Sequence, residues 1–163
     1  MKIELKKISF NERMSEETNC FIADLYINGK KVGYCKNAGT GGCTDYNAYT
    51  SEDRKAIAEA EAHCKTIPNV WESNLEGMID QLLEDYLNAK AKKRINKLME
   101  KAILWGVPNS GRYTMIKYIV PLSHVAKAQP QKLQETIDAI KKLHCAGNVQ
   151  ILNTNLEALG IQL

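Results

Sequence analysis

The chain has 163 residues, of which 44% are hydrophobic and 25% charged, and its formal net charge is +3. This composition excludes the intrinsically disordered class, and so modest a positive charge permits contact with nucleic acid or an acidic protein without requiring it. The opening residues MKIELKK lack the apolar core of a signal peptide, and no window of the sequence is apolar enough to span a membrane. We therefore expect a cytoplasmic protein with no membrane partner.

The first 49 residues predict an antiparallel β-sheet. Apolar and charged residues alternate from Lys2, and Asn28-Gly29 separates two further alternating runs. An Asn-Gly pair in this setting is the strongest short-range signal for a β-hairpin with a type I′ turn. The register of that turn places Ala23 opposite Tyr34. We expect one face of the hairpin to enter the core, and it carries Phe21, Ala23, Leu25, Val32 and Tyr34.

Helices follow the predicted sheet. Thr50 offers a hydroxyl cap for a helix over 51–64, and Ser73-Asn74-Leu75-Glu76 is a capping-box sequence that opens a long amphipathic helix over 74–104. Gly106, Pro108 and Gly111 stop this helix. Beyond them we expect a strand over 112–122, a helix from Pro130 and a short strand over 149–152.

The predicted elements define an α+β fold. We expect a single domain over residues 1–163, with a candidate internal boundary near 106–111. The C-terminal strand–helix–strand portion either adds to the N-terminal sheet or forms a subdomain of its own.

The glycine-rich segment after the hairpin is one candidate site. Glycines free the backbone to approach a ligand closely, as in phosphate-binding loops. However, the segment does not lead into a helix and lacks the Gly-Lys-Ser/Thr signature, so it also fits a simple connection between strands. If it binds a nucleotide-like small molecule, the residues concerned are Gly39, Gly41, Gly42, Asp45 and Tyr46.

The second half of the long helix is strongly basic. Six cations occur within residues 90–101, opposed only by Glu100. Bases near a helix C-terminus complement the helix dipole, but this density also predicts a surface that meets phosphates or an acidic partner. The same helix is a candidate homodimer interface. We expect contacts with RNA or a nucleoprotein complex from Lys90, Lys93, Arg94, Lys97 and Lys101.

Catalytic and metal-binding patterns are missing from the sequence. The five cysteines include no Cys-x-x-Cys pair, and they and the three histidines lack zinc-site spacing. We therefore predict no catalytic residue, no metal and no cofactor, and keep a cysteine-dependent enzyme as an alternative. The leading prediction is a non-enzymatic intracellular binding protein.

Two resemblances accompany these patterns. The segment DLYINGKKVGY with the glycine-rich loop after it resembles the N-terminal part of small uncharacterised phage and mobile-element proteins. That resemblance implies a phage accessory factor or a host-defence inhibitor. The order strand, turn, strand, glycine-bearing connection, strand and helix from Phe21 to Cys64 is similar to the later part of a double-stranded-RNA-binding domain, which implies contact with RNA.

Overall fold

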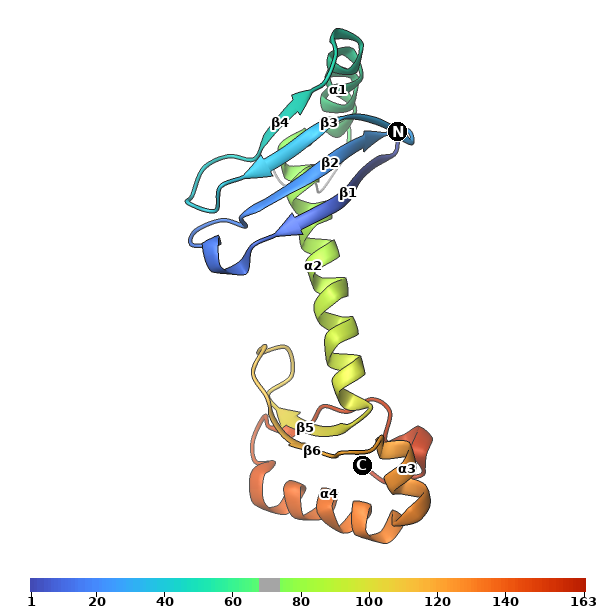
Figure 1. Cartoon of the computed structure of the whole chain (residues 1–163). Helices are drawn as coiled ribbons and strands as arrows, with labels where there is room; N and C mark the ends of the chain where they lie inside the picture. The colour runs from blue at the N-terminus through green and yellow to red at the C-terminus, as the bar shows by residue number, and fades with distance from the viewer. Residues whose placement is uncertain (68–73) are drawn as a thin grey trace. The chain divides into compact units, whose positions relative to one another are not determined.

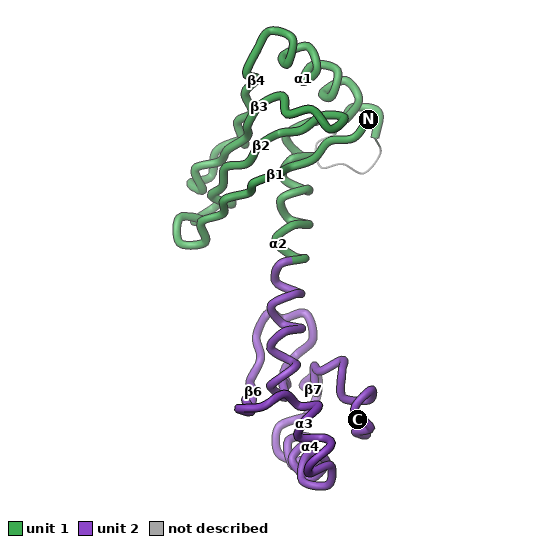
Figure 2. Tube along the Cα trace, turned by 45° about the vertical axis from the view of Figure 1, so that its right-hand side comes forward, with its two compact units in different colours: residues 1–89 green, residues 90–163 purple. Residues whose placement is uncertain are grey.

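The computed structural model describes residues 1–67 and 74–163 and confirms the α+β class (Figure 1). The chain divides into two compact units, Met1–Ala89 and Lys90–Leu163 (Figure 2). Each unit has its own sheet and its own hydrophobic core. The long helix α2, Leu75–Met99, contributes residues to both units. Among the described residues, no helix is long and apolar enough to cross a membrane.

The first unit is built on a four-stranded antiparallel sheet in the order β1-β2-β3-β4. Asn28 and Gly29 form the predicted turn, and both have the positive φ (49° and 84°) that a type I′ turn requires. A short 3-10 helix, Glu12–Met14, lies between the first two strands. The strands are β1 Ile3–Phe10, β2 Phe21–Ile27, β3 Lys30–Asn37 and β4 Asp45–Ala48.

The hairpin register departs from the prediction after the first two pairs, Ile27 with Lys30 and Tyr26 with Lys31. A bulge then shifts the register, so Ala23 lies opposite Cys35 instead of Tyr34. A bulge adds one residue to one strand and therefore switches which side chains face the core. Cys35 is fully buried and Tyr34 only half-buried. The assignment of Tyr34 to the core was wrong, whereas the other four predicted core residues are buried.

Helix α1, Ser51–Cys64, packs against the sheet at the predicted position. The Thr50 hydroxyl accepts a hydrogen bond from the Asp53 amide (3.1 Å) and donates one to Asp53 Oδ2 (2.7 Å). Lys30 Nζ, from the hairpin turn, lies 3.1 Å from Asp53 Oδ1. Asp53 therefore hydrogen-bonds the Thr50 cap at the start of the helix and ties the helix to the hairpin. The core of this unit also includes Leu75, Ile79 and Leu83 of α2.

The start of α2 is only partly described. Ser73, the first residue of the predicted capping box, lies outside the described residues, as does Pro68, which was expected to end the preceding helix. Asn74 Oδ1 accepts a hydrogen bond from the Gly77 amide (2.7 Å) and so satisfies one of the free donors in the first turn.

The second unit has a three-stranded sheet in the order β6-β5-β7. The strands are β5 Ala102–Gly106, β6 Thr114–Lys117 and β7 Gln150–Ile151. Two helices, α3 Leu122–Ala128 and α4 Pro130–His144, and a 3-10 helix, Glu157–Leu159, complete the unit. The C-terminal portion thus forms a sheet of its own. The candidate boundary near 106–111 falls in the loop between the paired strands β5 and β6.

The predicted helix over 74–104 is too long at its C-terminal end. The helix ends at Met99, and Ala102, Ile103 and Leu104 belong to the central strand β5, where all three are fully buried. Ile103 packs into the core with α3 and α4, and Leu104 packs on the opposite face with Met99. A strand buried on both faces shows no alternation, so a short apolar run does not distinguish it from a helix. The strand predicted over 112–122 is likewise shorter, because Pro121 precedes the first turn of α3.

Asn153 holds the junction between α2 and β5. Its Oδ1 accepts a hydrogen bond from the Leu104 amide (2.7 Å), and its Nδ2 donates to the Ala102 carbonyl (2.8 Å). Asn155 Nδ2 donates to the Met99 carbonyl at the end of the helix (3.0 Å). Asn153 is only 3% exposed, so water does not offer an easy replacement for these bonds.

Substituting Asn153→Ala should destabilise the second unit. The change leaves the Leu104 amide and the Ala102 carbonyl buried without their side-chain partner, which should lower the free energy of unfolding by about 2–4 kcal/mol. The measurement is urea denaturation followed by Trp105 fluorescence in a Trp71→Phe background. The exposed Asn148→Ala serves as the matched control. Equal stability of the two variants would contradict a clamping role for Asn153.

The carboxylate of Asp53, which hydrogen-bonds the Thr50 cap, should make stability depend on pH. The Thr50 hydroxyl, with help from Lys30, lowers the pKa of Asp53 below its ordinary value of 3.8. A lowered folded-state pKa adds stability above pH 3.8 that is lost as the pH falls through the folded value. Asp53→Asn should therefore be less stable than the wild type at neutral pH, and this difference in stability should disappear in acid. Thermal melts of the wild type and the variant from neutral pH to below pH 3.8 test this expectation, with Glu52→Gln as the control. A difference in melting temperature that persisted unchanged in acid would contradict the role given to the Asp53 carboxylate.

Candidate functional site

A groove of about 410 Å³ lies between the last turns of α2 and strand β6, entirely within the second unit. Side chains alternate along a strand, so Tyr113, Met115 and Lys117 share one side of the β6 segment. Their side is that of α2, because Met115 and Lys117 pair with Leu104 and Ala102, which pack against Met99. We call this surface the basic groove. Its lining consists of Arg94, Lys97, Leu98, Glu100, Lys101, Tyr113, Met115 and Lys117.

Backbone contacts fix the two walls of the basic groove. Lys97 lies in the last turn of the helix and Lys101 lies two residues past its end, and the Lys101 carbonyl accepts a hydrogen bond from the Tyr118 amide (2.7 Å). Ala102, the next residue, pairs with Lys117. The cations of the helix end and the cation of β6 are therefore held beside one another by the fold.

The basic groove carries an excess of positive charge. Its four cations are opposed by Glu100 alone among the lining residues. Within residues 1–67 and 74–163, none of Lys97, Lys101 and Lys117 forms an ion pair with a carboxylate, and the same holds for Arg94. The side chains are exposed, so they are available to an external anion.

The predicted basic residues divide into two sets. Arg94, Lys97 and Lys101 line the basic groove, whereas Lys90 and Lys93 are exposed on α2 outside its lining. Sequence reasoning missed Lys117 and Tyr113. The alternation along the strand indicated that residues 113, 115 and 117 share one face. It did not show that this face lies beside the helix, because that follows only from the pairing of β6 with β5, the strand directly after the helix.

The glycines of the predicted ligand loop take part in packing within the chain. The Gly39 carbonyl accepts hydrogen bonds from the amides of Glu16 (2.9 Å), Glu17 (3.0 Å) and Thr18 (3.3 Å). Gly39 has φ +88°, and a Cβ at this position would collide with the Met14 carbonyl oxygen. The glycine therefore lets the loop after β3 lie against the loop after β1.

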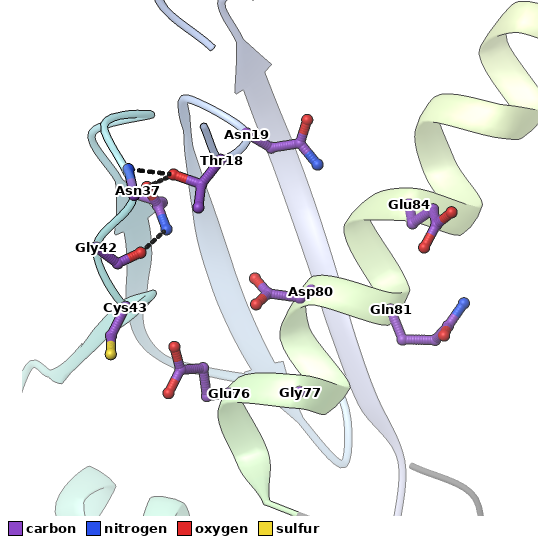
Figure 3. A pocket seen from close by; sticks show the side chains of 11 residues that line it. Thr18, Asn19, Asn37, Gly42, Cys43, Glu76, Gly77, Asp80, Gln81 and Glu84 are labelled. Atoms are coloured by element: carbon purple, nitrogen blue, oxygen red, sulfur yellow. Dashed lines mark hydrogen bonds between the residues drawn. The ribbon is translucent and has the colours of Figure 1, made fainter. Parts of the chain in front are cut away.

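Asn37 organises the same region (Figure 3). Its Nδ2 donates to the Gly42 carbonyl (2.9 Å), and its Oδ1 accepts from the Thr18 hydroxyl (2.8 Å) and the Gly39 amide (2.8 Å). Asn37 is 8% exposed. One buried side-chain amide thus bonds two residues of the glycine loop and also links this loop to the loop that carries Thr18. No pattern in the sequence indicated this role of Asn37.

An acidic cleft of about 420 Å³ lies between this loop and the first turns of α2. Glu76, Asp80 and Glu84 come from the helix, as Figure 3 shows. Glu76 Oε1 accepts a hydrogen bond from the Thr44 amide (2.8 Å), and Asp80 Oδ1 accepts one from the Thr44 hydroxyl (2.7 Å). Carboxylates on one wall disfavour a phosphate ligand, because like charges repel.

The five predicted loop residues do not converge on one cavity. Gly41 and Gly42 line the acidic cleft, and Gly42 also lines a second hollow beside β2 and β3 together with Asp45. Tyr46 points to α1, where its hydroxyl donates to Glu61 Oε1 (2.7 Å). Burial and this hydrogen bond raise the pKa of Tyr46 to about 12. A nucleotide-like ligand for the glycine loop stays a prediction, and the geometry adds no support for it.

The cysteines are mostly buried or half-buried. Burial raises the pKa of the Cys35 thiol to about 12 and also raises that of Cys64, so both are neutral thiols at neutral pH. Cys43 is exposed. In the part of the chain that the structure describes, no group of three or more His, Cys, Asp or Glu residues could hold a metal ion. A cysteine-dependent enzyme stays an alternative without a located nucleophile–base pair.

Comparison with known proteins adds no family. No family model, curated protein or solved structure matches the chain. The likeness to phage and mobile-element proteins therefore stays a prediction, as does a homodimer through α2.

The packing role of the glycine loop can be tested with a matched pair of variants. Gly39→Ala should lower the free energy of unfolding by roughly 2 kcal/mol or more, because φ is positive and the added methyl group collides with backbone. Gly42→Ala should change it by less than about 0.5 kcal/mol, since a Cβ there meets nothing within 4 Å. Urea denaturation measures both. Similar values for the two variants would contradict the packing role.

Proposed function

We propose that the protein is a non-enzymatic RNA-binding protein that holds the phosphate backbone in the basic groove. The observation that carries this proposal is the position of Lys117. It lies on β6, yet it lines the same groove as Arg94 and Lys97 of α2 and Lys101, which lies two residues past the end of α2. Two elements that are separate in the sequence thus supply cations to one surface.

The helix dipole does not explain this arrangement. Dipole complementarity accounts for cations in the last turn of a helix, where Lys97 lies. It does not account for Lys117, which belongs to a strand. Clustering like charges costs free energy, so a cluster without carboxylate partners is typical of a surface that receives an anion. Four cations opposed by one carboxylate in the lining suit a polyanion better than a single small anion.

The apolar and aromatic side chains of the groove lining also suit RNA as a ligand. Leu98 and Met115 provide apolar surface between the cations, and Tyr113 provides an aromatic ring. A groove that tracks phosphates beside aromatic and apolar side chains is the usual arrangement for nucleic acid bound along its backbone. An acidic protein surface would use the cations but leave the ring without a specific role.

Salt dependence tests the proposal. The affinity for a labelled RNA, measured by fluorescence anisotropy, should fall steeply as the salt concentration rises, because phosphate contacts release counterions. The variant with Lys97, Lys101 and Lys117 changed to Ala should bind more weakly. Its slope of log affinity against log salt should be smaller by about 2, at roughly 0.7 per lost contact to a single strand.

The matched control removes the same charge elsewhere in the second unit. Changing Lys127, Lys132 and Lys142 of α3 and α4 to Ala lowers the net charge equally but leaves the basic groove intact. This control should keep the wild-type slope. Equal losses in the two triple variants would show a nonspecific charge effect, and an affinity that ignored salt would exclude phosphate binding in the groove.

A further inference from the structure

Tyr113 occupies a position that the charge argument does not explain. It is 40% exposed and lines both the basic groove and a second hollow of about 470 Å³. We call the latter the aromatic hollow, because Trp105 and His144 lie in its wall. Residue 113 therefore lies where a cationic surface and an aromatic one adjoin.

The aromatic hollow presents flat π surface beside a cation. The rings of Trp105 and His144 stack with centroids 5.4 Å apart and planes at 22°. Trp105 is only 7% exposed, so the outer face of this stack is that of the exposed His144. Arg112 adds a positive charge to the same wall. Tyr113 and His144 are thus the aromatic rings within reach of a ligand.

The backbone holds Tyr113 in place before any ligand arrives. A Cβ on Gly106 would lie 2.7 Å from the Arg112 carbonyl oxygen and 3.3 Å from the Tyr113 Cα, so the strand-to-strand loop returns close to β5 only because residue 106 is glycine. Thr114, the next residue, pairs with Trp105. A backbone fixed in this way loses little conformational entropy when a ligand binds.

We infer that the partner is a single-stranded nucleic acid, with phosphates in the basic groove and a base stacked on Tyr113. This inference rests on the proposed function and specifies its substrate. The bases of a duplex are already stacked on each other and show only their edges, so a duplex cannot use an aromatic ring beside the phosphate track. A single strand offers both its backbone and the faces of its bases.

The test compares three labelled probes: an oligoadenylate RNA, the same RNA annealed to oligouridylate, and the DNA strand of the same sequence. Fluorescence anisotropy with the full chain should give an affinity for the single-stranded RNA at least about tenfold higher than for the duplex. Single-stranded DNA should bind too, since stacking and phosphate contacts need no 2′-hydroxyl. Duplex binding as tight as single-strand binding would overturn the inference.

Variants of Tyr113 locate the contact. Tyr113→Ala should weaken binding of the single strand about 5- to 150-fold, which corresponds to roughly 1–3 kcal/mol for one stacked base. The slope of log affinity against log salt should be retained, because tyrosine neutralises no phosphate. Tyr113→Phe, which keeps the ring, should restore most of the affinity. Equal losses in the Ala and Phe variants would contradict stacking.

Ile119→Ala is the matched control, since Ile119 is 97% exposed and lines neither hollow. It should bind as the wild type does, and Trp105 fluorescence should show that each variant is folded. The outcomes separate the two claims. Steep salt dependence without a single-strand preference would retain the proposed function and overturn this inference, whereas no salt-dependent binding of any probe would overturn both.

Discussion

The architecture of the second unit depends on how the chain passes from α2 into β5 within two residues. A helix that ends at Met99 leaves free carbonyls, and a strand that begins at Ala102 requires partners at once. Asn153 and Asn155 meet these needs with their side chains. Because Ala102 is then the partner of Lys117, the same junction brings the cation of β6 beside those of α2. A buried hydrogen-bond arrangement thus determines where the exposed charges lie.

The N-terminal sheet was largely predictable because its signals are local. The Asn28-Gly29 turn and the alternation of β2 before it depend on neighbouring residues only, and both are confirmed. The bulge was not predictable, since Val32 and Gly33 fit either register equally well by hydrophobicity. The buried Cys35 and the half-buried Tyr34 follow from that one extra residue. The role of Asn37 escaped prediction for a similar reason, because its partners come from two different loops.

Only the α2 wall of the basic groove was predictable from the sequence. The density of cations on α2 is a property of one segment and was visible in the sequence, whereas the contribution of β6 requires knowing that β5 is a strand. The run from Ala102 to Leu104 is uniformly apolar, so it continued the helical pattern before it and concealed the change of structure. A single sequence does not reveal which distant strands pair with each other. The β6 wall of the groove depends on such a pairing, that of β6 with β5, so it was not predicted.

One property of α2 follows from the burial of its residues. From Asn88 to Arg94 every residue is exposed, so this stretch is held by backbone hydrogen bonds and by the helix-forming tendency of its alanines and lysines, without core packing. Amide hydrogens here should exchange with solvent faster than those near Ile79 or Met99, because local opening costs less. A polyanion seated beside Arg94 would restrain the end of that stretch. Isotope uptake at these amides would therefore register occupancy of the neighbouring surface without any label on the ligand.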